Sequence, residues 1–177
     1  MNLIGPEQKA AVQKSVNELR AAKSPSDYIG VNKTVVTLVE NQHSVAKVRG
    51  FDLIQDEPAG VAGGARGPTP TDYFVAAMGT CENVVFVRYA ALEGIPIESL
   101  ETSVTGVWDR RGLYGIDGVD SRFKEIMIET RVLTEGSKET VAEVARRTHK
   151  GCPIYATLDK ATLLIFKLVV NGESVPL

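Results

Sequence analysis

Two cysteines are the residues of this chain best suited to chemistry, and they lie far apart in the sequence. Cys81 stands in "PTPTDYFVAAMGTCENVV", and Cys152 follows 71 residues later in "THKGCPIYATL". This spacing excludes a C-x-x-C redox motif and a four-cysteine zinc site. Because a cysteine is nucleophilic only as a thiolate, any function requires the fold to activate the sulfurs or to bring them together.

The two cysteines have different local surroundings. Cys152 precedes Pro153, and proline favours the first position of a helix, so Cys152 is predicted to be an N-cap beside free backbone N–H groups that favour a thiolate. Cys81 falls inside an apolar helical segment, where burial raises the pKa of a thiol unless a cation is close. Local sequence therefore makes Cys152 the more reactive thiol, and a small apolar core residue is the alternative for each.

Histidine is the third candidate for chemistry. His149 lies three residues before Cys152, and His43 is the only other histidine. An H-x-x-C pair can be half of a metal site, but the remaining ligands would have to be carboxylates from elsewhere, so no metal and no other cofactor is predicted. A Cys–His dyad for acyl transfer is a further alternative, although the chain has no nucleophile elbow.

Composition is that of an ordinary globular protein with one domain. The 177 residues are 44% apolar and 24% charged, with a formal net charge of −2. Because the basic residues are scattered, nucleic acid is not an expected partner.

The first 25 residues lack a secretory signal, which predicts a cytoplasmic location. Asp72, Glu82 and Arg88 interrupt the longest apolar segment, so a membrane span is not expected either.

The longest predicted helix carries Cys81. It begins with Thr69 as N-cap and Pro70 at its first position, and it ends at Gly94, before Pro96. Apolar residues cover most of its circumference, which predicts a central, buried helix.

Residue periodicity and turn signals predict the other elements, and their order indicates an α+β fold. Helices are expected over Pro6–Lys23, from Ser137 to Gly151 and from Pro153 to about Lys160, and strands near Thr34–Glu40, Ser44–Ile54, Leu100–Trp108, Arg122–Leu133 and Thr162–Val170.

Both cysteine segments together resemble the OsmC/Ohr superfamily, the osmotically inducible and organic hydroperoxide resistance proteins. The segments "GGARGPTPTDYFVAAMGTC" and "ARRTHKGCPIYATL" match its Gly/Pro-rich loop, its long cysteine-bearing helix and its later CP segment, and the strand order between them agrees. The resemblance spans roughly Lys33 to Gly172. The chain is therefore expected to form a single OsmC-like domain over residues 1–177, with residues 1–30 as an N-terminal helical extension outside the resemblance. The resemblance also implies an intertwined homodimer in which two central cysteine-bearing helices are packed between β-sheets.

The resemblance further implies a thiol-dependent peroxidase. Cys81 would attack a small organic hydroperoxide and become a sulfenic acid, and Cys152 would resolve it to a disulfide. A dithiol reductant of the lipoamide or thioredoxin type would then restore both thiols. This assignment reverses the reactivity order that local sequence suggests.

In the family, an arginine and a glutamate beside the helix cysteine stabilise its thiolate. Asp72 is the nearest match to the carboxylate. The family's arginine comes from the first hairpin, where this chain has none at the turn, so Arg49 and Arg66 are the candidate cations, with Lys47 and His43 as further substitutes.

The missing arginine keeps a second function open. The alternative is a non-catalytic OsmC-like stress protein that senses redox state or binds a small apolar ligand.

Overall fold

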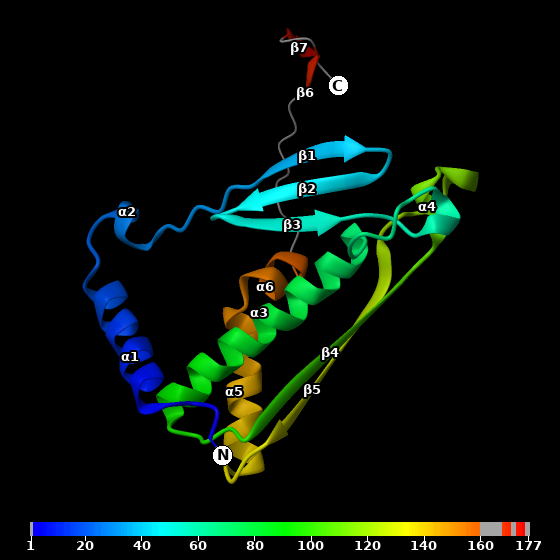
Figure 1. Cartoon of the computed structure of the whole chain (residues 1–177). Helices are drawn as coiled ribbons and strands as arrows, with labels where there is room; N and C mark the ends of the chain where they lie inside the picture. The colour runs from blue at the N-terminus through cyan, green and yellow to red at the C-terminus, as the bar shows by residue number, and fades with distance from the viewer. Residues whose placement is uncertain (1, 160–167, 171–172, 176–177) are drawn as a thin grey trace.

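The computed structural model describes residues 2–159, 168–170 and 173–175, in which helices combine with three antiparallel sheets (Figure 1). The predicted α+β architecture is confirmed. The predicted strand over Thr162–Val170 lies largely outside the described residues, which contain only its last three positions. The helices are α1 (Pro6–Ala21), α2 (Pro25–Tyr28), α3 (Pro70–Glu93), α4 (Arg110–Leu113), α5 (Lys138–Gly151) and α6 (Pro153–Asp159), and the strands are β1 (Val35–Glu40), β2 (His43–Val48), β3 (Phe51–Gln55), β4 (Ser99–Trp108), β5 (Phe123–Leu133), β6 (Leu168–Val170) and β7 (Glu173–Val175).

Helix α3 begins and ends where its local chemistry predicts. The Thr69 hydroxyl accepts a hydrogen bond from the Asp72 N–H, and the Asp72 carboxylate accepts one from the Thr69 N–H, at 3.3 and 2.9 Å. This reciprocal capping box satisfies two donors that a helix N-terminus leaves free. Gly94 ends the helix at φ +71°, a conformation that glycine adopts without a steric cost.

Replacing Thr69 by alanine is expected to lower the free energy of unfolding by about 1 kcal/mol, because the first turn of α3 loses its capping oxygen. Urea denaturation followed by circular dichroism measures this loss. Thr69→Asn keeps a capping oxygen and is the matched control. Equal losses in the two variants would contradict the capping role.

The first sheet differs from the predicted hairpin. The segment expected as one strand over Ser44–Ile54 is two strands, β2 and β3, and the sheet is an antiparallel meander in the order β1-β2-β3. A two-residue turn at Arg49 and Gly50 separates them, with φ values of +48° and +86°. Such turns need positive φ at both central residues. The prediction was wrong because apolar and β-branched residues lie on both sides of the turn, which only Gly50 marks.

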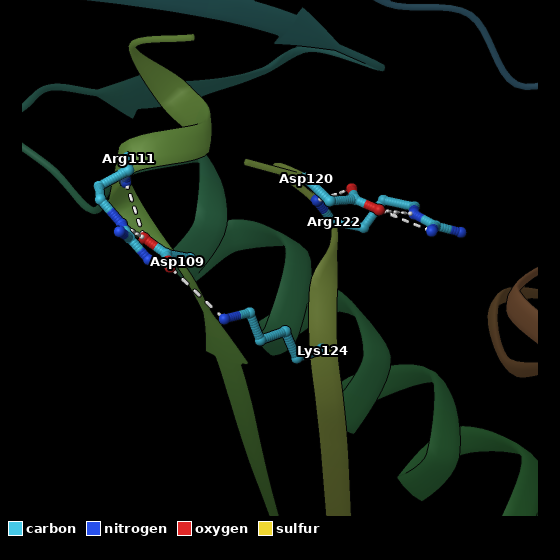
Figure 2. Close-up of polar contacts among 5 residues, drawn as sticks. All are labelled: Asp109, Arg111, Asp120, Arg122 and Lys124. Carbon is cyan, nitrogen blue, oxygen red and sulfur yellow. Dashed lines mark hydrogen bonds and ion pairs between the residues drawn. The ribbon is translucent and has the colours of Figure 1, made fainter. Parts of the chain in front are cut away.

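The long β4–β5 ribbon pairs Ser99 with Leu133 at one end and Trp108 with Phe123 at the other. Asp109 organises the loop at the Trp108 end, because its carboxylate accepts a hydrogen bond from the Arg111 N–H and forms ion pairs with Arg111 and Lys124 at 2.7 and 3.4 Å. Figure 2 shows these contacts beside the separate Asp120–Arg122 pair. The Arg111 hydrogen bonds hold the pKa of Asp109 well below its usual range.

The core lies where α3 packs against α5 and β4, with α1 alongside α3 (Figure 1). Within one chain α3 is buried on one side only, and Val84 remains 51% exposed. The prediction of a helix buried nearly all round is therefore not met by a single chain. The buried apolar cluster consists of Ile4, Phe86, Ala90, Ala91, Ile95, Ile97 and Val144.

Candidate functional site

The fold brings the two distant cysteines into contact. Cys81, in the middle of α3, and Cys152, at the junction of α5 and α6, are both free thiols, and their sulfurs lie 2.8 Å apart. A disulfide requires a sulfur separation of about 2.05 Å, so a small movement is enough to join them. Cys152 is fully buried, whereas Cys81 is partly exposed.

Cys152 is held by two helices at once. Its backbone N–H donates to the Thr148 carbonyl at the end of α5, at 2.8 Å. Its sulfur accepts a hydrogen bond from the Tyr155 N–H in the first turn of α6, at 3.5 Å. This is the geometry of an N-cap, so the position predicted for Cys152 before a helix starting at Pro153 is confirmed.

A glycine allows the end of α5 to approach α3. A Cβ atom at Gly151 would lie 2.6 Å from the hydroxyl oxygen of Tyr89 on α3, so a larger residue here would force the helices or the Tyr89 ring to shift. Arg147 reinforces the same contact, because its guanidinium lies 4.4 Å from the centre of the Tyr89 ring and pairs with Glu93. The close approach of these helices places Cys152 against Cys81.

Cys81 is not a preformed thiolate in a single chain. Burial raises the pKa of its thiol to about 11, and the hydrogen bond from Cys152 and the charge of Glu82 act in the same direction. The backbone N–H of Ile154, in the first turn of α6, lowers that pKa but does not outweigh the burial. A cation close to Cys81 would therefore have a large effect on its reactivity.

Glu82 is a functional candidate that the sequence prediction missed. Its side chain is 3% exposed, and one carboxylate oxygen, Oε1, lies 3.2 Å from Nε2 of His149. Its other oxygen, Oε2, has no hydrogen-bond partner among the described residues. The His149 ring stacks on Tyr155, with ring centres 4.8 Å apart. The one sequence signal was a carboxylate in the middle of a helix predicted to be buried, where a charged group requires a buried partner.

The buried carboxyl group of Glu82 predicts a pH dependence of stability. Burial raises its pKa above the ordinary value of 4.5, and His149 only partly opposes this shift. The folded state therefore holds this proton more tightly than the unfolded state, so the associated stability is present below pH 4.5 and is lost as the pH rises through the folded pKa. As the pH rises through this range, the Glu82→Gln variant is expected to gain stability relative to the unmodified protein, because glutamine cannot lose a proton.

Urea denaturation at several pH values between 4.5 and 7.5 measures that difference. Glu18→Gln, at an exposed surface pair with Lys14, is the control and is expected to give a flat difference. A flat difference for Glu82→Gln as well would show that Glu82 does not titrate differently in the folded protein.

The three other residues predicted from the family pattern lie away from the thiols within one chain. Asp72 is bound in the α3 capping box, and Cys81 is about two and a half turns further along the helix and on its opposite side. Arg66 pairs with Glu40 at 2.5 Å, and Arg49 is in the β2–β3 turn.

The two further substitutes also have other partners. Lys47 pairs with Asp52 at 3.0 Å, and Nδ1 of His43 lies 3.1 Å from the Gln55 carbonyl oxygen. The structure thus unites the two cysteines but supplies none of the predicted charges beside them from the same chain.

A cavity of about 670 Å³ lies at the N-terminal end of α3. Its apolar walls include Trp108, Leu113, Tyr114 and Phe123, and Thr69–Thr71 form its edge at the start of the helix. It is therefore separate from the thiol pair.

In residues 2–159 and the two short C-terminal strands, no three His, Cys, Asp or Glu side chains gather in a way that could hold a metal ion. Over the same residues, no helix has the length and apolar character needed to cross a bilayer.

Comparison with known proteins identifies both a sequence family and a fold. A family model described as OsmC-like protein matches residues 63–166, more than half of the chain. No curated protein matches. Similar solved structures include an OsmC-like protein from Mycoplasma pneumoniae, with 21% identity, a TM-score of 0.64 and coverage of 75% of this chain and 89% of that one.

Two further similar structures carry names that mention hydroperoxide. An OsmC-like hydroperoxide resistance protein from Jannaschia is 19% identical, with a TM-score of 0.53 and coverage of 79% of this chain and 93% of that one. The organic hydroperoxide resistance protein OhrB of Bacillus subtilis is 20% identical, with a TM-score of 0.50 and coverage of 73% and 92%. At these identities the structures establish a shared fold.

Proposed function

Because the chain belongs to the OsmC-like protein family, we propose that it is a thiol-dependent peroxidase that reduces organic hydroperoxides to alcohols through Cys81 and Cys152. The observation that carries the proposal is the 2.8 Å contact between two free thiols that are 71 residues apart in the sequence. The hydroperoxide resistance proteins of Jannaschia and Bacillus subtilis, which share the fold, support the choice of substrate.

The proposed reaction has three steps. The Cys81 sulfur attacks the terminal hydroperoxide oxygen, the O–O bond breaks, and the alkoxide takes up the thiol proton to leave as an alcohol. The Cys152 sulfur then attacks the Cys81 sulfenic acid, an S–S bond forms, and the S–OH group leaves as water with the second thiol proton. A dithiol reductant of the lipoamide or thioredoxin type reduces the disulfide and is itself oxidised.

Exposure supports the division of roles between the two cysteines. Cys81 is partly exposed, so a peroxide can reach it, whereas Cys152 is 0% exposed and can be reached only by the neighbouring sulfur. Cys81 is thus the peroxidatic cysteine and Cys152 the resolving cysteine.

A homodimer is part of the proposal. Apolar side chains of the first sheet are more than half exposed in the single chain, among them Val36, Leu38 and Phe51. A second copy would bury this surface. Asp72, Arg49 and Arg66, which do not reach the thiols of their own chain, would act on Cys81 only across that dimer.

A turnover assay with the purified protein tests the proposal. Cumene hydroperoxide should be consumed continuously in the presence of dihydrolipoamide, with one dithiol oxidised for each peroxide reduced. Consumption no faster than with dihydrolipoamide alone would contradict peroxidase activity.

The cavity beside Trp108 supports a second candidate function, the binding of a small apolar ligand. Trp108 is the only tryptophan of the chain, so its fluorescence reports directly on this cavity. A saturable change in tryptophan fluorescence on addition of decanol, lost in a Phe123→Ala variant, would favour ligand binding. A linear, non-saturating change would count against it.

A further inference from the structure

A buried charge pair lies beside the thiols and is built from the same two segments of chain. Glu82 follows Cys81 on α3, and His149 lies one helical turn before Cys152 at the end of α5. The contact between Oε1 of Glu82 and Nε2 of His149, at 3.2 Å, therefore crosses the same helix interface as the contact between the sulfurs. Tyr155 links the two contacts, since its ring stacks on His149 and its N–H donates to the Cys152 sulfur.

We propose that the Glu82–His149 pair sets the reactivity of Cys81, with the carboxylate of Glu82 opposing the thiolate and the imidazole of His149, which contacts that carboxylate, offsetting its charge. The inference deepens the proposed peroxidase function and rests on it for its biological role. Glu82 and His149 are positioning residues in this account, because they act on the thiolate through their charges and not on the peroxide.

The burial of Glu82 makes its charge effective. A carboxylate that is 3% exposed is poorly screened by water, and its Oε2 atom lacks a hydrogen-bond partner among the described residues, so neither solvent nor protein neutralises it fully. Its charge contributes to the raised pKa of the Cys81 thiol. Removing this charge should therefore favour the thiolate.

His149 is the residue that the structure pairs with Glu82. Its side chain is 43% exposed, and its Nε2 atom faces the buried carboxylate. Two neighbouring cations on α5 have other partners, since Arg146 pairs with Glu143 and Arg147 with Glu93. On α6, the group that faces His149 is the Tyr155 ring.

A purely structural role for the pair predicts a different result from a charge role. If the contact only held α5 against α3, loss of either partner would loosen the same interface and would change Cys81 reactivity in the same direction. If the pair acts through charge, loss of the carboxylate and loss of the imidazole that offsets it must have opposite effects.

The test measures iodoacetamide alkylation of Cys81 at pH 7 in a Cys152→Ser background, where it is the only cysteine. Because one pKa unit changes the thiolate fraction about tenfold, Glu82→Gln is expected to react about five- to tenfold faster than the parent, and His149→Gln about threefold slower. His149→Lys, which supplies a cation at this position, should restore the parent rate or exceed it. Arg146→Gln removes an exposed cation of α5 that pairs with Glu143 on the same helix, and it is expected to leave the rate unchanged.

Two results would overturn the inference: a change in the same direction for Glu82→Gln and His149→Gln, or a Glu82→Gln rate no higher than that of the parent. Oxidation of the same variants by one equivalent of cumene hydroperoxide separates this inference from the proposed function. Opposite alkylation effects without any oxidation of Cys81 would overturn the peroxidase and leave the charge pair standing. Oxidation of Cys81 together with same-direction alkylation effects would overturn the charge pair and leave the peroxidase standing.

Discussion

Replacing Cys81 by serine is expected to lower the turnover of cumene hydroperoxide with dihydrolipoamide at least about 1000-fold. A serine hydroxyl is hardly ionised at neutral pH, and it cannot be oxidised to a sulfenic acid. Cys152 cannot take over the first step, because it is 0% exposed and a peroxide cannot reach it past Cys81. The measurement is steady-state peroxide consumption with the dithiol in excess.

Cys152→Ser is the matched control for this prediction. Cys81 can still react once in this variant, so one equivalent of peroxide should be consumed and a sulfenic acid should accumulate on Cys81. A sulfenic acid reagent such as dimedone, with mass spectrometry of the Cys81 peptide, detects this product. Turnover by Cys81→Ser at the rate of the unmodified protein would contradict the assignment, as would sulfenic acid found on Cys152 instead.

Replacing Phe86 by alanine is expected to lower the free energy of unfolding by about 3–5 kcal/mol, the usual cost of emptying a buried aromatic site. Phe86 is 1% exposed and lies in the cluster where α3 meets α5 and β4. This loss is a large fraction of the stability of an ordinary domain. Urea denaturation followed by circular dichroism measures the change.

Tyr28→Ala is the control for Phe86→Ala, because it also removes an aromatic ring but from a site that is 56% exposed on α2. Its cost is expected to stay below about 0.5 kcal/mol. Similar losses in the two variants would mean that the core does not lie at Phe86.

Elements with local chemical signals could be predicted from the sequence. Thr69, Pro70 and Gly94 determine the ends of α3 through capping and backbone conformation, and these signals need no tertiary information. The N-cap position of Cys152 follows from Pro153 in the same way. The β2–β3 turn was missed because Arg49 adopts positive φ there without being one of the residue types that favour it.

The site depends on contacts between distant segments, and local patterns do not reveal these. Helical periodicity sets Glu82 about 100° away from Cys81, so only the packing of α5 against α3 could reveal its pairing with His149. Proximity of Cys81 and Cys152 came from the family resemblance and not from spacing. The single-domain boundaries, the homodimer and the roles of Asp72, Arg49 and Arg66 stay predictions.

Mass spectrometry of non-reduced peptides tests the central claim, that Cys81 and Cys152 form one redox-active pair. The reduced protein is treated with one equivalent of cumene hydroperoxide, and its remaining thiols are alkylated before digestion. The peptides containing Cys81 and Cys152 are expected to appear joined by a disulfide and to separate again after reduction by dihydrolipoamide. Full alkylation of both cysteines after peroxide treatment would contradict it.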